Sequence, residues 1–178
     1  VFFAEEVAGR LINANEQIEL ANISGSISDN EMAQVKAFIT QMMPILNNII
    51  DNMANVSLNE SLTHGNLTLE NALYLHDLDT VILIDPYSET YSESLLGDLS
   101  QLMQSSLSFY EEVVSSGEEN IKDLFHTYEI QQKTGVSYFG ELLELHISSF
   151  HRKNLDLIYY FYGAQFIRMF PFKIQSTP

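Results

Sequence analysis

Cysteine is absent from this chain of 178 residues. Without cysteine there is no disulfide framework, no thiolate zinc site and no cysteine nucleophile. Positive charge is scarce as well, because 8 Lys and Arg residues stand against 24 Asp and Glu residues and leave a formal net charge of −16. A surface this acidic repels a phosphate backbone and anionic lipid. We therefore expect neither nucleic acid nor a membrane surface as a partner.

Long apolar runs are missing too. The longest tight run, Val81–Ile84, is far shorter than the ~18 residues that cross a bilayer. The opening residues Val1–Ala4 meet Glu5 and Glu6 at once and have no basic flank, which is not the pattern of a secretory signal. These absences predict a cytoplasmic protein without a membrane segment.

The chain has enough apolar surface to fold. Hydrophobic residues make up 46% of it and aromatic residues 11%, which excludes a disordered acidic tail. The length is that of one domain, and no internal repeat or low-complexity tract divides it. We predict one mainly helical (α+β) domain over residues 1–178.

Apolar residues recur at spacings of three and four through most of the chain, as in amphipathic helices. The predicted helices cover residues 1 to about 22, about 29 to 55, the stripe from Leu99 to Val114, 116 to near 135, about 136 to 150, and 153 to 169. Ser28 with Glu31 three residues later forms a capping box that starts the second helix. Pro44 predicts a kink or an irregular turn, and Pro171 is expected to end the last helix.

Residues 56–95 have a different composition, in which Asn, Ser, Thr and Gly dominate. Two short β-like runs stand within this part, Ala72–Leu75 and Thr80–Ile84, and His76–Asp79 fits a turn between them. Pro86 prevents the second run from continuing as a central strand. The pattern predicts a small β-hairpin in a helical chain.

Residues suited to phosphate chemistry flank this hairpin. His64, Gly65 and Asn66 are followed by Asn71 before the first strand and by Asp85 after the second. Phosphoryl transfer needs Mg²⁺ ligands beside the nucleotide phosphates and a group that accepts the proton of the incoming hydroxyl. An Asn amide oxygen and an Asp carboxylate are hard donors that suit Mg²⁺. A tight hairpin would bring Asn71 and Asp85 together although fourteen positions separate them.

This spacing resembles the catalytic core of the aminoglycoside-phosphotransferase and choline-kinase branch of the protein-kinase-like superfamily. Members read His-Gly-Asp, four residues, Asn, a short hairpin, and an apolar strand that ends in Asp. The resemblance implies the helical C-terminal lobe of a kinase-like fold, with its catalytic core at about residues 56–115. It also implies ATP as co-substrate, Mg²⁺ held by Asn71 and Asp85, and a small-molecule acceptor such as a sugar or a polysaccharide precursor.

Three further residues take roles from the resemblance. His64 packs behind the catalytic loop and fixes its shape. Asp98 looks like the residue at the head of a family helix that braces this loop, although an Asp there is also an ordinary N-cap. Family members place acceptor contacts on their C-terminal helices, which makes Arg168 a candidate contact for an anionic acceptor. The alternative for Arg168 is a solvated charge on a packed amphipathic helix.

The sequence departs from the family pattern at Asn66, where the family has its catalytic Asp. An amide cannot accept the proton of the acceptor hydroxyl, and general-base catalysis is worth about 10²- to 10⁴-fold in rate. We therefore expect severely reduced turnover. A natural pseudokinase and a deliberate Asp-to-Asn change both fit this residue.

A second departure lies before residue 64, where no Gly-rich strand-turn-strand and no strand Lys is found. The chain therefore resembles the C-terminal lobe alone, and its own N-terminal lobe is the partner that ATP binding requires. The competing interpretation is a non-catalytic pseudokinase or a helical module that presents a surface to a protein partner. The phosphoryl-transfer interpretation fails if Asn71 and Asp85 point apart or if the stretch between them is helical.

Overall fold

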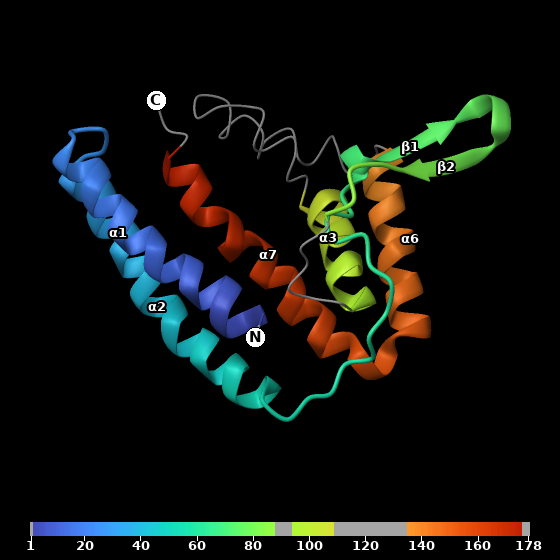
Figure 1. Ribbon diagram of the computed structural model, residues 1–178, viewed down its shortest axis with the longest axis horizontal. Coiled ribbons are helices and arrows are strands. Elements are labelled where there is room, and N and C mark those ends of the chain that lie inside the picture. Colours follow the sequence, from blue (N-terminus) through green and yellow to red (C-terminus); the bar gives the residue numbers. More distant parts are fainter. Residues whose placement is uncertain (1, 88–93, 109–134, 176–178) are drawn as a thin grey trace. The chain divides into compact units, whose positions relative to one another are not determined.

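The structure is a computed structural model that describes residues 2–87, 94–108 and 135–175. These residues form five α-helices, a π-helix, three short 3₁₀ turns and one two-stranded sheet (Figure 1). The predicted mainly helical α+β class is confirmed. The chain divides into two compact units, residues 1–59 with 163–178 and residues 60–162. The single domain stays a prediction, and each unit is described by itself.

The first unit opens with a π-helix, Phe2–Ala8, that leads directly into α1, Gly9–Ile23. Helix α2, Asp29–Met53, packs against both (Figure 1). Apolar residues spaced by three and four give these helices a shared buried face. The face contains Val7, Leu11, Ala14, Ile18, Ile39 and Leu46. Both predicted N-terminal helices are confirmed, and the remainder of the unit is the C-terminal part of α7, Leu155–Gln175.

The predicted capping box starts α2. Glu31 N–H donates to Ser28 Oγ at 3.3 Å, and Ser28 N–H donates to Glu31 Oε2 at 2.7 Å. Two orphan donors of the first turn are thereby satisfied. The hydrogen bonds from the Ser28 side chain and backbone hold the pKa of Glu31 below its usual value, because they favour the charged carboxylate.

Two prolines lie inside helices. Helix α2 is continuous through Pro44, and α7 continues past Pro171 to Gln175. The predictions of an irregular turn at Pro44 and of a helix end at Pro171 are therefore wrong, while a kink at Pro44 stays a prediction. Proline removes one N–H and crowds the preceding turn. In α2 this cost is offset by the apolar face on either side of Pro44, where Ile39 and Leu46 are buried.

The second unit contains α3, Leu95–Leu107, α6, Gly135–Phe150, a 3₁₀ turn, Arg152–Asn154, and the first residues of α7. Helices α3 and α6 pack against each other. Their buried apolar residues are Leu96, Leu99, Met103, Leu143 and Ile147. The helices predicted at 136–150 and 153–169 are confirmed. The helix predicted at 116–135 and the end of the Leu99–Val114 stripe lie outside the described residues.

The hairpin is present where the sequence predicts it. Strand β1, Ala72–Leu75, pairs antiparallel with β2, Thr80–Leu83, in a register that places Ala72 opposite Leu83. The turn is closed by Asp79 in the left-handed region, at φ 46°. Tyr74 donates its hydroxyl hydrogen to Asp79 Oδ1 at 2.6 Å, and this hydrogen bond raises the pKa of Tyr74.

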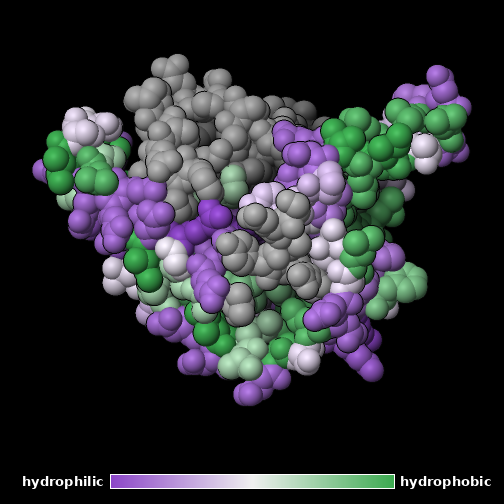
Figure 2. Space-filling model, in the orientation of Figure 1, coloured by the Kyte–Doolittle hydropathy of each residue, from purple (hydrophilic) through white to green (hydrophobic). Residues whose placement is uncertain are grey.

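The hairpin exposes apolar side chains from both faces of its two strands. The exposed residues are Leu73, Tyr74, Val81, Ile82 and Leu83, and Figure 2 shows hydrophobic atoms along this element. Large apolar side chains are exposed on the helices too, among them Leu20 and Ile23 in α1, Ile45 in α2 and Leu145 in α6. Within the described ranges no helix has the length and hydropathy of a membrane span.

Substituting Gly140 with Ala should destabilise the α3–α6 packing. A Cβ at this position would lie 2.9 Å from Leu107 Cδ2 and 3.1 Å from the backbone oxygen of Ser106. We expect a loss of about 1–3 kcal/mol in the free energy of unfolding, because the backbone of α3 has to shift. Chemical denaturation followed by far-UV circular dichroism measures it.

The matched control is Gly163→Ala in α7, where no atom lies within 4 Å of the added Cβ. Replacing this helical glycine should leave stability unchanged or raise it by up to about 1 kcal/mol. If Gly140→Ala is as stable as Gly163→Ala, the close approach of α3 and α6 is contradicted.

Candidate functional site

The loop His64–Asn66 is attached to α3 through one carboxylate. His64 N–H donates to Asp98 Oδ2 at 2.7 Å, and Gly65 N–H donates to Asp98 Oδ1 at 2.9 Å. Asp98 is only 5% exposed. Charge-assisted hydrogen bonds of this kind are about twice as strong as neutral ones. The N-cap of α3 is Ser94, which accepts from Leu96 N–H, so the N-cap alternative for Asp98 is wrong and its carboxylate binds the loop.

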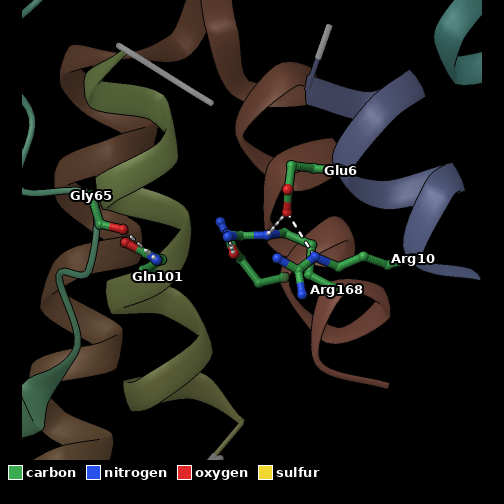
Figure 3. A network of polar contacts seen from close by, with 6 residues as sticks. Glu6, Arg10, Gly65, Gln101 and Arg168 are labelled. Atoms are coloured by element: carbon green, nitrogen blue, oxygen red, sulfur yellow. Dashed lines mark hydrogen bonds and ion pairs between the residues drawn. The ribbon is translucent and has the colours of Figure 1, made fainter. Parts of the chain in front are cut away.

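Two further side chains of α3 continue this attachment. Gln101 Oε1 accepts from Leu67 N–H at 2.9 Å. Its Nε2 donates to the carbonyl oxygen of Gly65 at 3.2 Å, as Figure 3 shows. Ser105 Oγ accepts from Leu69 N–H at 3.2 Å. Gln101 and Ser105 are not among the site residues predicted from the sequence. Positions 98, 101 and 105 lie on one face of α3 and are buried, but the sequence does not single them out, because Ser100, Gln104 and Ser106 of the same helix are polar and buried too.

Asn71 closes the loop at its other end. Its side-chain Nδ2 donates to the carbonyl oxygen of Asn66 at 2.8 Å. Its own carbonyl oxygen accepts from Ile84 N–H at 3.0 Å. Asn71, just before β1, and Ile84, just after β2, are therefore hydrogen-bonded neighbours, and Asp85 is the next residue along the chain. The intervening stretch is the antiparallel hairpin and not a helix.

Asp85 lies beside Asn66. Asn66 Nδ2 is 3.4 Å from Asp85 Oδ2, in hydrogen-bonding orientation and exposed to solvent. Asp85 has φ 56°, in the left-handed region that non-glycine residues rarely adopt, and Gly65 has φ 74°. Such backbone conformations cost about 1–3 kcal/mol when the residue is not glycine, and they gather at functional sites. Tyr87 N–H donates to the carbonyl oxygen of His64 at 2.9 Å, which holds the segment after Asp85 against the loop.

His64 contributes its backbone rather than its ring to these hydrogen bonds. Both ring nitrogens are buried and have no hydrogen-bond partner within the described ranges. Its amide and carbonyl groups are both bound, to Asp98 and to Tyr87. The packing role implied for His64 stays a prediction.

The donor atoms at the hairpin base have the chemistry that Mg²⁺ requires. Because Asn71 Nδ2 donates to Asn66, its Oδ1 is the amide atom left for a cation. The Asp85 carboxylate accepts one long hydrogen bond and keeps further lone pairs. The described residues contain no group of three or more His, Asp or Glu side chains that could hold a metal ion by themselves. A cation here would need water or phosphate oxygens to complete its shell, as Mg²⁺ commonly does.

Arg168 belongs to the first unit and is engaged there. Its Nε lies 3.4 Å from Glu6 Oε2, which also accepts from Arg10 Nε at 2.7 Å (Figure 3). Arg168 Nη1 donates to Gln165 Oε1 at 2.8 Å, and its guanidinium lies 5.6 Å from the ring centre of Phe2. An anionic acceptor at Arg168 would have to compete with the buried Glu6 carboxylate.

Comparison with known proteins gives no assignment: no family model, no curated protein and no solved structure matches the chain.

Replacing Asp98 with Asn should loosen the loop. The amide keeps one acceptor oxygen but turns an NH₂ group toward the second backbone donor, so one N–H of His64 or Gly65 loses its acceptor. We expect a loss of about 1–3 kcal/mol in unfolding free energy. Hydrogen exchange should accelerate at the amides of residues 64 and 65, and both quantities are measurable by NMR and chemical denaturation.

Asp77→Asn, in the exposed hairpin turn, is the control for removing one negative charge. It should change neither stability nor exchange at the loop. Equal exchange rates in Asp98→Asn and the unaltered chain would contradict the attachment of the loop through Asp98.

Proposed function

We propose that this chain is the helical C-terminal lobe of a small-molecule kinase that transfers the γ-phosphoryl group of ATP to a hydroxyl of a sugar-like acceptor or polysaccharide precursor. The observation that carries the proposal is the loop anchored by Asp98, together with the backbone hydrogen bond from Ile84 to Asn71 that closes the base of the hairpin between Asn71 and Asp85. Two oxygen donors held this way suit a nucleotide-bound cation.

The reaction assigns a place to each residue. The acceptor oxygen attacks the γ-phosphorus, the bond from that phosphorus to the β-phosphate oxygen breaks, and ADP leaves. Residue 66, in the loop held by Asp98, orients the acceptor hydroxyl. A carboxylate at this position takes the proton of that hydroxyl. Asn66 can orient the hydroxyl but takes no proton, so the chain as it stands is catalytically impaired.

Asn71 and Asp85 are the residues that would hold Mg²⁺. Bound Mg²⁺ neutralises charge on the nucleotide phosphates and on the phosphoryl group in transit. His64 and Asp98 act through the backbone of the loop, because Asp98 binds the amides of His64 and Gly65. They are positioning residues and not ligands.

ATP binding requires more than this lobe. A chain at −16 has little besides Mg²⁺ to offset the charge of ATP. We propose that the Lys and the Gly-rich strands come from an N-terminal lobe, which is the chain's partner, and that the protein acts in the cytoplasm. The Glu6 ion pair makes Arg168 a weaker candidate for the acceptor contact.

A second function is favoured by Asn66 itself. A residue that cannot accept a proton fits a pseudokinase, or a helical module that binds a protein through its surface. The exposed apolar hairpin is consistent with a partner on that element. The two functions make opposite predictions for a carboxylate at position 66.

Asn66→Asp in the full-length protein that contains this chain should raise ATP-dependent phosphorylation of the acceptor by about 10²- to 10⁴-fold, because it supplies the missing proton acceptor. Release of ADP in a coupled assay measures turnover against a panel of sugars and polysaccharide precursors. Asn66→Asp combined with Asp85→Asn should return activity to the starting level. A folded Asn66→Asp protein that stays inactive on the panel and hydrolyses no ATP would favour the pseudokinase.

The 178 residues alone should bind ATP weakly or not at all. Calorimetric titration with ATP and Mg²⁺ should give no saturable heat, since the strand Lys that holds the phosphates is absent. A dissociation constant in the low micromolar range would show that the lobe needs no partner for nucleotide and would overturn this part of the proposal.

A further inference from the structure

Asn66 is in contact with both residues that flank the hairpin. Its side-chain amide donates to Asp85 Oδ2, and its carbonyl oxygen accepts from Asn71 Nδ2. The same carbonyl oxygen accepts from Thr68 N–H at 3.0 Å. Residue 66 therefore sets the local charge and the geometry of the two oxygen donors at once.

The charge of residue 66 decides the sign of its interaction with Asp85. A neutral amide offers an N–H to the carboxylate. A carboxylate at the same position would bring two negative groups to about the 3.4 Å that now separates Nδ2 from Oδ2. Carboxylates that share a site disfavour each other's ionised form. The net charge of −16 adds to this repulsion.

The backbone cannot easily relieve such a repulsion. Hydrogen bonds from Ile84 N–H and Tyr87 N–H hold the segment on both sides of Asp85. Gly65, on the other side, is held by Asp98 and Gln101. The two side chains are therefore kept near each other by separate attachments of their own segments.

We propose that Asn66 is a positioning residue that holds the Asp85 carboxylate in place without a cation, so that the folded loop does not depend on divalent metal. A carboxylate at residue 66 converts the same loop into one that needs a divalent cation between residues 66 and 85. This inference rests on the proposed function only in taking Asp85 as a residue that faces a cation.

The test is thermal unfolding of the 178-residue chain and of Asn66→Asp, each in EDTA and in millimolar MgCl₂ at matched ionic strength. The unaltered chain should unfold at the same temperature in both buffers. Asn66→Asp should unfold at a lower temperature in EDTA, and MgCl₂ should raise its midpoint by roughly 2–4 °C or more. Titration calorimetry with MgCl₂ should show at least about tenfold tighter binding to Asn66→Asp, because the number of charged ligands increases.

Two variants separate charge from the loss of the amide. Asn66→Ala removes the donor without adding charge and should show no response to MgCl₂. Asn66→Asp with Asp85→Asn removes one of the two carboxylates and should lose the MgCl₂ response. Asn is the suitable replacement at residue 85 because it also tolerates left-handed backbone. If Asn66→Asp is unfolded in EDTA, folding on addition of MgCl₂ is the expected result.

The inference is overturned if MgCl₂ raises the midpoint of the unaltered chain as much as that of Asn66→Asp, or if MgCl₂ does not stabilise Asn66→Asp. It is also overturned if the double variant keeps the response. These outcomes are independent of phosphorylation. If the 178-residue Asn66→Asp chain responds to the cation but the full-length Asn66→Asp protein has no kinase activity, the positioning role stands and the proposed function is contradicted. If the full-length variant has kinase activity but the chain shows no cation response, the proposed function stands and the positioning role is contradicted.

Discussion

The candidate site depends on the bond between a buried carboxylate and two consecutive backbone amides. Asp98 accepts from His64 and Gly65, which fixes the loop that carries Asn66 on the first turn of α3. Because Asp98 binds only the backbone amides of residues 64 and 65, it fixes the path of the chain there and makes no demand on the side chain of residue 66. Gln101 and Ser105 extend the same contact along the loop. The rigid helix thereby determines where the hairpin begins.

The hairpin itself brings distant residues together at little cost in chain length. Its two strands are four residues each, and the first pair of the ladder lies next to Asn71. An isolated two-stranded hairpin is marginal in water. Here its base is held by the hydrogen bonds of Asn71 to Asn66 and to Ile84, so the part nearest the loop is the better-supported part. The geometry at Asp85 therefore depends on the loop more than on the strands.

Much of the fold could be predicted from the sequence because its signals are local. The capping box of Ser28 and Glu31, the spacing of three and four in the helices, and the two β-like runs around His76–Asp79 each depend on nearby residues alone. The wrong prediction of an irregular turn at Pro44 has the opposite origin, since the buried residues Ile39 and Leu46 on either side of it show that packing along a helix can outweigh a local breaker. The Asn71–Ile84 hydrogen bond places Asn71 beside the segment that leads into Asp85, and the expected convergence of the Asn71 and Asp85 side chains on one cation stays a prediction.

The attachment of the loop to α3 was harder to predict in full. Asp98 was identified only through the resemblance, and its alternative as an N-cap was wrong because Ser94 occupies that position. Gln101 and Ser105 could not be recognised as loop contacts, since a polar residue on a helix gives no indication of which backbone group it will bind. The ion pair of Arg168 with Glu6 could not be predicted either, because the two residues are far apart in the sequence.

The two-stranded sheet has a consequence for the behaviour of the chain at high concentration. Among the described residues each strand is paired on one side only, so within this part of the chain the outer backbone groups of β1 and β2 have no strand partner. Natural sheets usually protect such edges with lysine or proline, and these strands contain neither. The apolar side chains of both strands and the β-branched residues of β2 also favour association. Purified samples are therefore best protected from strand-to-strand aggregation by a lysine on an outward-facing position of β2.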